Sequence, residues 1–211
     1  MTRPTTTLLR SLCALMVGIA FISGCAKKPN HAAIPRSSTV VALGDSLTFG
    51  TGATSEGSYP SVLATLSGWN VINAGVPGET AAEGCARLSA LIDEHKPALV
   101  LVLLGGNDLL RRRPESEIRD ALIVCHASAR AGGIQMVLMP VPRFGAGGLG
   151  DAGVYDEVRS EIGVPMIDAG LADLLGRASM RSDHVHLNAS GYRAMAGIVA
   201  DGLREHGFLA R

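Results

Sequence analysis

The sequence lacks an excess of charge of either sign, and it contains few aromatic residues. Lys and Arg total 19, Asp and Glu total 19, and Phe, Trp and Tyr make up 4% of the 211 residues. Proteins that bind nucleic acid usually present a basic surface, and those that bind single strands add aromatic side chains on which bases stack. The composition therefore argues against nucleic acid as a partner.

Two sequence motifs that mark common enzyme folds are also missing. No G-x-G-x-x-G opens a helix after a strand-like run, which argues against a dinucleotide-binding domain. No G-x-S-x-G pentapeptide is present, which argues against an ordinary α/β-hydrolase. What the chain does have is 47% hydrophobic residues together with 26 Gly and 10 Pro, a balance that suits one compact domain with a full core.

The apolar N-terminal run is too short for a typical membrane span. Residues 11–26 are uncharged and follow Arg3 and Arg10, which is the plan of a secretory signal. The stretch ISGC at Ile22–Cys25 resembles a bacterial lipoprotein signal, in which cleavage leaves the cysteine as a lipid-modified first residue. This resemblance implies a signal peptide over residues 1–24 and lipidation of Cys25. A plain signal peptide or a short anchor helix is the alternative.

Residues 25–38 are predicted to be a tether between the lipid and the folded domain. The segment AKKPNHAAIPRSS is polar, carries two prolines and has no apolar periodicity. The folded domain is then expected over residues 39–211. The lipid anchor would be the protein's contact with a membrane, and it would place the domain in the bacterial cell envelope, facing the periplasm or at the outer membrane.

From residue 39 onward, short apolar runs alternate with amphipathic ones. This alternation predicts a three-layer α/β/α fold with a flavodoxin-like, five-stranded parallel sheet of strand order 2-1-3-4-5. The glycine-rich stretch 143–153 is expected to be a mobile loop rather than a second domain. The expected strands are Val40–Leu43, Val71–Asn73, Ala98–Leu104, Gln135–Met139 and Pro165–Ile167, and the expected helices are Thr80–His95, Glu115–Ala131 and Ser190–His206.

Four polar groups follow the expected strands, and in a parallel sheet such groups gather at one edge. They are Asp45-Ser46, residues 73–80 (NAGVPGET), residues 105–108 (GGND) and residues 182–188 (SDHVHLN). Taken singly, each has an ordinary structural explanation as a helix cap, a turn or a surface group. Together they supply what acyl transfer to a serine needs, namely a nucleophile, a base with an orienting acid, and donors for an oxyanion.

The same segments resemble the SGNH or GDSL esterases, and in particular their arylesterase, acyl thioesterase I and lysophospholipase-like branch. GDSLTFG, NAGVPGETAAEGCARL, LLGGND and DHVH match four ordered blocks of that family. The resemblance implies that Ser46 is the nucleophile, His186 the base and Asp183 its orienting acid. It also implies an oxyanion hole made of the Ser46 and Gly78 backbone N–H groups and the Asn107 side chain, with no metal or organic cofactor.

Some residues depart from the pattern or lie outside it. Leu187 follows the histidine where the family often has proline, and an additional His184 lies inside the block. His184-x-His186 is half of a zinc site at most, so His184 is expected to be a bystander. Asp45 is expected to hold the loop beside the nucleophile.

Cys85 and Cys125 each lie on the apolar stripe of an expected helix. They are expected to be buried thiols, with a disulfide as the open alternative, because an exported protein meets an oxidising compartment.

The sequence thus predicts a serine esterase or thioesterase that hydrolyses small or acyl-chain esters and thioesters through an acyl-serine intermediate. A carbohydrate O-deacetylase on the same scaffold is the alternative within enzymes. A surface lipoprotein that only binds its ligand is the alternative outside them, although such a protein would not need Ser46, Asp183 and His186 together.

Overall fold

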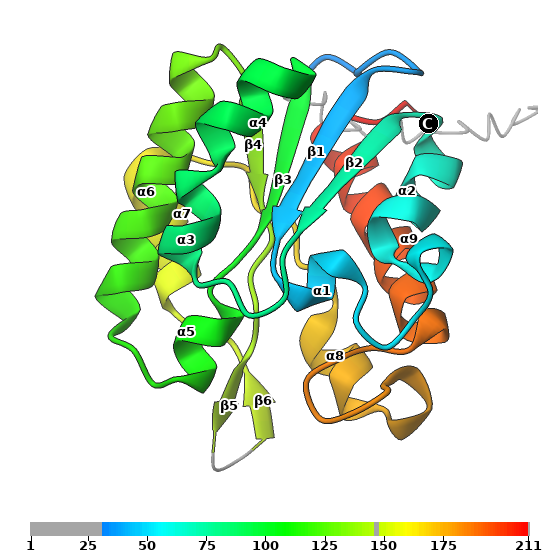
Figure 1. The fold of residues 1–211 in the computed structure, drawn as a ribbon, viewed down its shortest axis with the longest axis vertical. Coiled ribbons are helices and arrows are strands. Elements are labelled where there is room, and N and C mark those ends of the chain that lie inside the picture. The colour runs from blue at the N-terminus through cyan, green and yellow to red at the C-terminus, as the bar shows by residue number, and fades with distance from the viewer. Residues whose placement is uncertain (1–30, 146–147, 211) are drawn as a thin grey trace, which may run out of the picture.

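The computed structural model describes residues 31–145 and 148–210, and these form a parallel sheet between two layers of helices (Figure 1). The helices α3, α4, α6 and α7 cover one face of the sheet, and α2 and α9 cover the other. Within the described residues, no helix is both long and apolar enough to cross a membrane. The predicted signal peptide and Cys25 lie outside the described residues.

The sheet has the strand order β2-β1-β3-β4, and every neighbouring pair is parallel. The fifth position is occupied by a single parallel bridge between Leu138 and Met166, flanked by backbone hydrogen bonds of 2.9 Å on either side. The predicted fold class is confirmed, with the fifth strand shortened to this bridge. The strands are β1 (Thr39–Gly44), β2 (Asn70–Gly75), β3 (Leu99–Leu103) and β4 (Gln135–Leu138).

The helices follow the strands in alternation. The central strand β3 is buried at every residue, because helices cover both of its faces, which explains its uninterrupted apolar sequence LVLVL. The α-helices are α1 (Ser46–Phe49), α2 (Tyr59–Ser67), α3 (Ala81–Ala86), α4 (Leu88–His95), α5 (Gly106–Leu110), α6 (Glu115–Ala131), α7 (Val154–Ile162), α8 (Leu171–Gly176) and α9 (Ala189–His206). Two 3₁₀ turns, η1 (Ser55–Gly57) and η2 (Ala178–Met180), complete the set.

The helix expected over residues 80–95 is interrupted at Arg87. Thr80 caps α3 through a capping box with Glu83, and the helix ends after Ala86. The Arg87 guanidinium donates to both oxygens of Glu79, at 2.7 and 2.6 Å, and to the Ala74 carbonyl at 2.9 Å. The break therefore lies where the chain is tied back to the loop that follows β2, a long-range contact that hydrophobic periodicity does not report.

The glycine-rich stretch after β4 forms a small antiparallel ladder rather than an irregular loop. Strands β5 (Arg143–Gly145) and β6 (Gly148–Gly150) pair with Phe144 opposite Leu149. Figure 1 shows this pair projecting from the edge of the molecule at which the main strands end. The mobility predicted for this stretch stays a prediction.

The described part of the predicted tether packs on the domain. The backbone N–H of Ile34 donates to the Phe208 carbonyl at 2.8 Å, and that of Ser37 donates to the Gly68 carbonyl at 2.7 Å. The indole N–H of Trp69 donates to the Ile34 carbonyl at 3.4 Å. From Ile34 onward, the segment predicted to be a tether is therefore part of the packed domain.

A disulfide joins Cys85 on α3 to Cys125 on α6, with a Cα–Cα distance of 5.0 Å. Both residues are almost fully buried. The expectation of two free buried thiols is therefore wrong, and the alternative holds. The apolar stripes of α3 and α6 face each other, so the pattern that predicted burial also brought the two side chains into bonding range.

The disulfide should contribute strongly to the stability of the domain. Because the bond closes a chain separation of 40 residues, replacing both cysteines by alanine should lower the free energy of unfolding by roughly 2–4 kcal/mol. Urea denaturation with and without reductant measures this. The double alanine variant should be insensitive to reductant, and a wild-type unfolding curve that does not move on reduction would contradict the prediction.

Candidate active site

Ser46 follows the end of β1, at the edge where the parallel strands of the sheet end. It is the first residue of α1, and Asp45 before it is the N-cap. Gly44 allows this tight turn, because a β-carbon there would lie 2.0 Å from Thr48 Oγ1 and 2.7 Å from the Leu103 carbonyl oxygen. A larger residue at position 44 would push α1 away from the sheet, so the local sequence fixes where the Ser46 hydroxyl lies.

Three of the predicted residues form one hydrogen-bonded chain. Ser46 Oγ lies 2.8 Å from His186 Nε2, and His186 Nδ1 lies 2.8 Å from Asp183 Oδ2. When Nδ1 carries the proton and donates to the carboxylate, Nε2 is free to accept the serine proton. Chemically, this arrangement can remove a proton from a serine hydroxyl and hold it on an imidazole.

The backbone around Asp183 fixes its carboxylate. Asp183 Oδ1 accepts the backbone N–H groups of Val185 and His186, each at 2.8 Å. Partial burial acts to raise the pKa of Asp183, but the hydrogen bonds from the His186 ring and from these two N–H groups outweigh it, and the pKa lies below its ordinary value. The carboxylate is therefore ionised where an imidazolium would form beside it.

His184 is exposed, and His186 is the histidine that meets Ser46. Among the residues the structure describes, no three His, Cys, Asp or Glu side chains lie together in a way that could hold a metal ion.

The other predicted site residues converge on the same place. Gly78 has a φ of +85°, a left-handed conformation that glycine adopts readily, and its carbonyl accepts from Arg111 Nη2 at 2.8 Å. Within the described part of the chain, the N–H groups of Ser46 and Gly78 donate no hydrogen bond. Asn107 Nδ2 donates to the Glu79 carbonyl at 2.9 Å, which brings its amide beside the Gly78 loop.

Three residues that sequence reasoning did not single out hold this loop in place. The buried carboxylate of Asp108 accepts the backbone N–H of Ala81 at 2.8 Å, so it caps the start of α3 from α5. Arg87 and Glu79 form an ion pair at the other side of the loop. Asp108 lies in the GGND segment, so its position next to Asn107 was the only available signal of its role.

Asp45 is almost fully buried, with 2% of its surface exposed. Its Oδ1 accepts the N–H of Leu47 at 3.0 Å, as expected of a loop-holding residue, and its Oδ2 accepts Asn107 Nδ2 at 3.1 Å. Burial raises the pKa of Asp45 to about 6, and the Leu47 hydrogen bond and the nearby His186 charge limit the rise. The contact with Asn107, 62 residues away, was not predicted.

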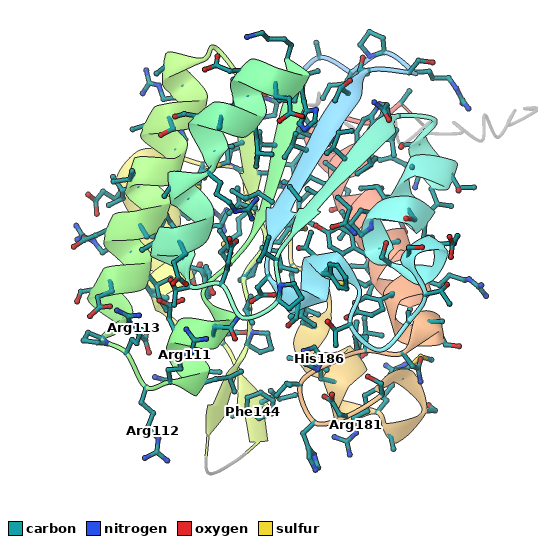
Figure 2. All side chains as sticks on the ribbon, viewed as in Figure 1. Arg111, Arg112, Arg113, Phe144, Arg181 and His186 are labelled. Atoms are coloured by element: carbon teal, nitrogen blue, oxygen red, sulfur yellow. A yellow bond between two sulfur atoms is a disulfide. The ribbon has the colours of Figure 1, made fainter. Side chains whose placement is uncertain are left out.

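A pocket of about 540 Å³ opens beside Ser46 and His186. More of its wall is apolar than polar, and Arg112, Arg113 and Arg143 also line it. In Figure 2, Arg111, Arg112 and Arg113 lie to one side, Arg181 lies to the other, and Phe144 and His186 lie between them. The apolar lining residues are Leu47, Leu109, Leu110, Val141, Pro142, Phe144, Leu175 and Val185, which come from separate segments that no local motif links.

Comparison with known proteins points to one family. A model of the GDSL-like Lipase/Acylhydrolase family matches residues 42–194. Esterase TesA of Pseudomonas aeruginosa is 34% identical over 132 residues, which cover 59% of this chain and 66% of TesA. Thioesterase 1/protease 1/lysophospholipase L1 of Escherichia coli K12 is 28% identical over 173 residues, which cover 79% of this chain and 83% of that protein.

A solved structure shows the same fold. The psychrotrophic esterase EstA from Pseudoalteromonas, in a structure inhibited by monoethylphosphonate, superposes with a TM-score of 0.71 at 24% identity. The superposition covers 80% of this chain and 97% of EstA. The three-layer arrangement of this chain is therefore that of the esterase.

Phe144 should influence how well longer substrates bind. Its side chain lines the pocket yet is 47% exposed, so Phe144→Ala should raise KM for octanoyl esters by roughly 3–10-fold, with kcat and acetyl ester hydrolysis nearly unchanged. Leu66 on α2 is similarly exposed, at 45%, and lies outside the pocket, so Leu66→Ala is the control. Equal losses on both esters would show that Phe144 does not contact the acyl chain.

Proposed function

This chain belongs to the GDSL-like lipase/acylhydrolase family and is a carboxylic ester hydrolase, and we propose that it cleaves acyl esters and thioesters through an acyl-enzyme on Ser46. The observation that carries the proposal is the chain of two 2.8 Å contacts from Ser46 through His186 to Asp183. A serine that only capped a helix would need no imidazole against its hydroxyl.

In the first half of the reaction, Ser46 Oγ attacks the substrate carbonyl carbon while His186 Nε2 takes its proton. The carbonyl π electrons move onto oxygen, and the resulting tetrahedral intermediate collapses by breaking the bond to the alcohol or thiol. His186 returns the proton to that leaving group. Water then repeats the sequence on the acyl-serine, which releases the acid and restores the hydroxyl.

The negative charge on the carbonyl oxygen would be stabilised by the N–H groups of Ser46 and Gly78 and by the amide of Asn107. The first two are supported by the absence of any other acceptor for them in the described part of the chain. Asn107 is supported by its place beside the Gly78 loop. The N–H groups of Ser46 and Gly78 need no rearrangement when the charge forms. The two amide hydrogens of Asn107 already donate to Asp45 Oδ2 and to the Glu79 carbonyl, so Asn107 would turn one of them to the oxyanion as the charge forms.

The pocket supports acyl chains or aryl groups as the substrate portion bound beside Ser46. More of its wall is apolar than polar, and its volume of about 540 Å³ is in the range of small-molecule sites. The names of the relatives, esterase and thioesterase/lysophospholipase, agree with such substrates. None of these names is that of a carbohydrate O-deacetylase, so the relatives do not favour that alternative.

We also propose that residues 1–24 are removed as a signal peptide and that Cys25 carries the lipid. The support is the ISGC stretch and the charge pattern before it. The lipid would hold the domain in the bacterial cell envelope.

The roles of the two histidines separate in mutants. His186→Ala should abolish ester hydrolysis about as completely as Ser46→Ala, and the double variant should be scarcely worse, because nucleophile and base act as a unit. Asp183→Asn should keep residual turnover, and His184→Ala should keep most of the activity. Hydrolysis of p-nitrophenyl butyrate by the purified variants, with folding checked by circular dichroism, measures this. An inactive His184→Ala beside an active His186→Ala would refute the assignment.

The lipid proposal is tested at its cysteine. Cys25→Ser should yield a protein that incorporates no palmitate and leaves the membrane fraction, while its esterase activity persists, because the core starts after the proposed tether. Metabolic palmitate labelling and fractionation of cells expressing the full chain provide the measurement. Labelling that persists in the variant would place the lipid elsewhere or exclude it.

A further inference from the structure

Asp45 connects two parts of the site that come from different strands. One carboxylate oxygen accepts the N–H of Leu47 in the nucleophile turn, at 3.0 Å, and the other accepts the amide of Asn107 on α5, at 3.1 Å. The bonds leave in different directions from a carboxylate that is 2% exposed. No other side chain in the described part of the chain hydrogen-bonds to Asn107.

An ionised carboxylate suits both donors best, because each of its oxygens accepts and neither carries a hydrogen. Protonation puts a hydrogen on one oxygen and makes that oxygen a poor acceptor, and an asparagine has an NH₂ group in its place, which sets a donor against a donor. A buried donor whose acceptor is weakened or lost is destabilising. The two bonds therefore favour the ionised form of Asp45.

The same contact decides which way the Asn107 amide points. Its nitrogen donates to Asp45 Oδ2 and to the Glu79 carbonyl, and both of these partners are acceptors. A flipped amide would place its own carbonyl oxygen against the carboxylate, where two acceptors repel. The carboxylate thus keeps the donating end of Asn107 turned toward the turn that carries Ser46.

We propose that Asp45 is a positioning residue that acts through Asn107, and that hydrolysis requires its carboxylate to be ionised. The proposal rests on the oxyanion role of Asn107 given above. It assigns Asp45 no contact with the substrate. It makes the activity depend on a proton-binding group in addition to the His186 base.

The surroundings of Asp45 bring the protonation of its carboxylate close to neutral pH. Burial raises the pKa of the Asp45 carboxyl to about 6. As the pH falls through this value, Asp45 gains a proton, loses one acceptor and releases either Leu47 or Asn107, so activity should fall. Two charged groups face Asp45: the charge of His186 lowers the pKa of Asp45, and the charge of Asp108 raises it. Three buried tyrosines also face it, and they stay neutral because burial raises their pKa values; they are Tyr59, Tyr155 and Tyr192.

The test is the acid side of the profile of log kcat/KM against pH, together with a double-mutant cycle. The wild-type limb should be steeper than one ionisation allows, because activity requires an ionised Asp45 as well as an unprotonated base. Asp45→Asn should lower kcat by roughly 10–100-fold with KM little changed, and its limb should fall to the slope of one ionisation. Asn107→Ala should show the same single slope, because Asp45 then has no oxyanion donor to position and one oxygen of the protonated acid still accepts from Leu47. The double variant should be no worse than Asn107→Ala.

Asp108→Asn is the matched control, because Asp108 is also 2% exposed but accepts from Ala81 rather than from Asn107. It should lower the melting temperature and keep the steep limb. Asn107→Ala gives the slope comparison even if Asp45→Asn does not fold. A single-ionisation limb in the wild type, or additive losses in the cycle, would overturn the proposal. Full activity of Ser46→Ala would instead overturn the proposed function, so the two failures are distinguishable.

Discussion

The hydrogen bond between Ser46 Oγ and His186 Nε2 joins residues that are 140 positions apart, and the site depends on it. It can form because parallel strands all end at the same edge of the sheet, where the turn after β1 meets the loop before α9. The loops after β2 and β3 lie at the same edge and bring Gly78 and Asn107 close to the turn that carries Ser46. A single topological constraint therefore assembles residues from four separate parts of the chain.

Close packing fixes the relative positions of the turns at this edge of the sheet. Gly75 at the end of β2 lies so close to α1 that a β-carbon would come within 2.1 Å of the Phe49 nitrogen. Asp45, Asp108 and the Arg87–Glu79 pair then link the turns to one another through side chains. Glycine allows the backbones to approach, and buried carboxylates fix their relative position.

The sequence predicts the features that depend on local pattern. The strands β1 to β4 and the helices α6 and α9 follow from apolar periodicity, and the polar residues at strand ends mark the edge of the sheet as the candidate site. The roles of Ser46, Asp183 and His186 came from the resemblance to the GDSL esterases. The features it does not predict depend on contacts between separate elements of the fold. Cys85 and Cys125 pair because α3 and α6 are neighbours, the 80–95 helix breaks where Arg87 reaches back to Glu79, and the Asp45–Asn107 contact spans two strands. The pairing of β5 with β6 was hidden because glycine-rich sequence has no periodicity to read.

Covalent labelling of the nucleophile tests the central claim most directly. A p-nitrophenyl alkylphosphonate has a tetrahedral phosphorus centre and leaves a stable adduct on a serine that attacks it. The account predicts one adduct per chain, located by peptide mass spectrometry on Ser46, with loss of esterase activity in proportion to labelling. An adduct on another residue, or a fully labelled protein that still hydrolyses esters, would contradict it.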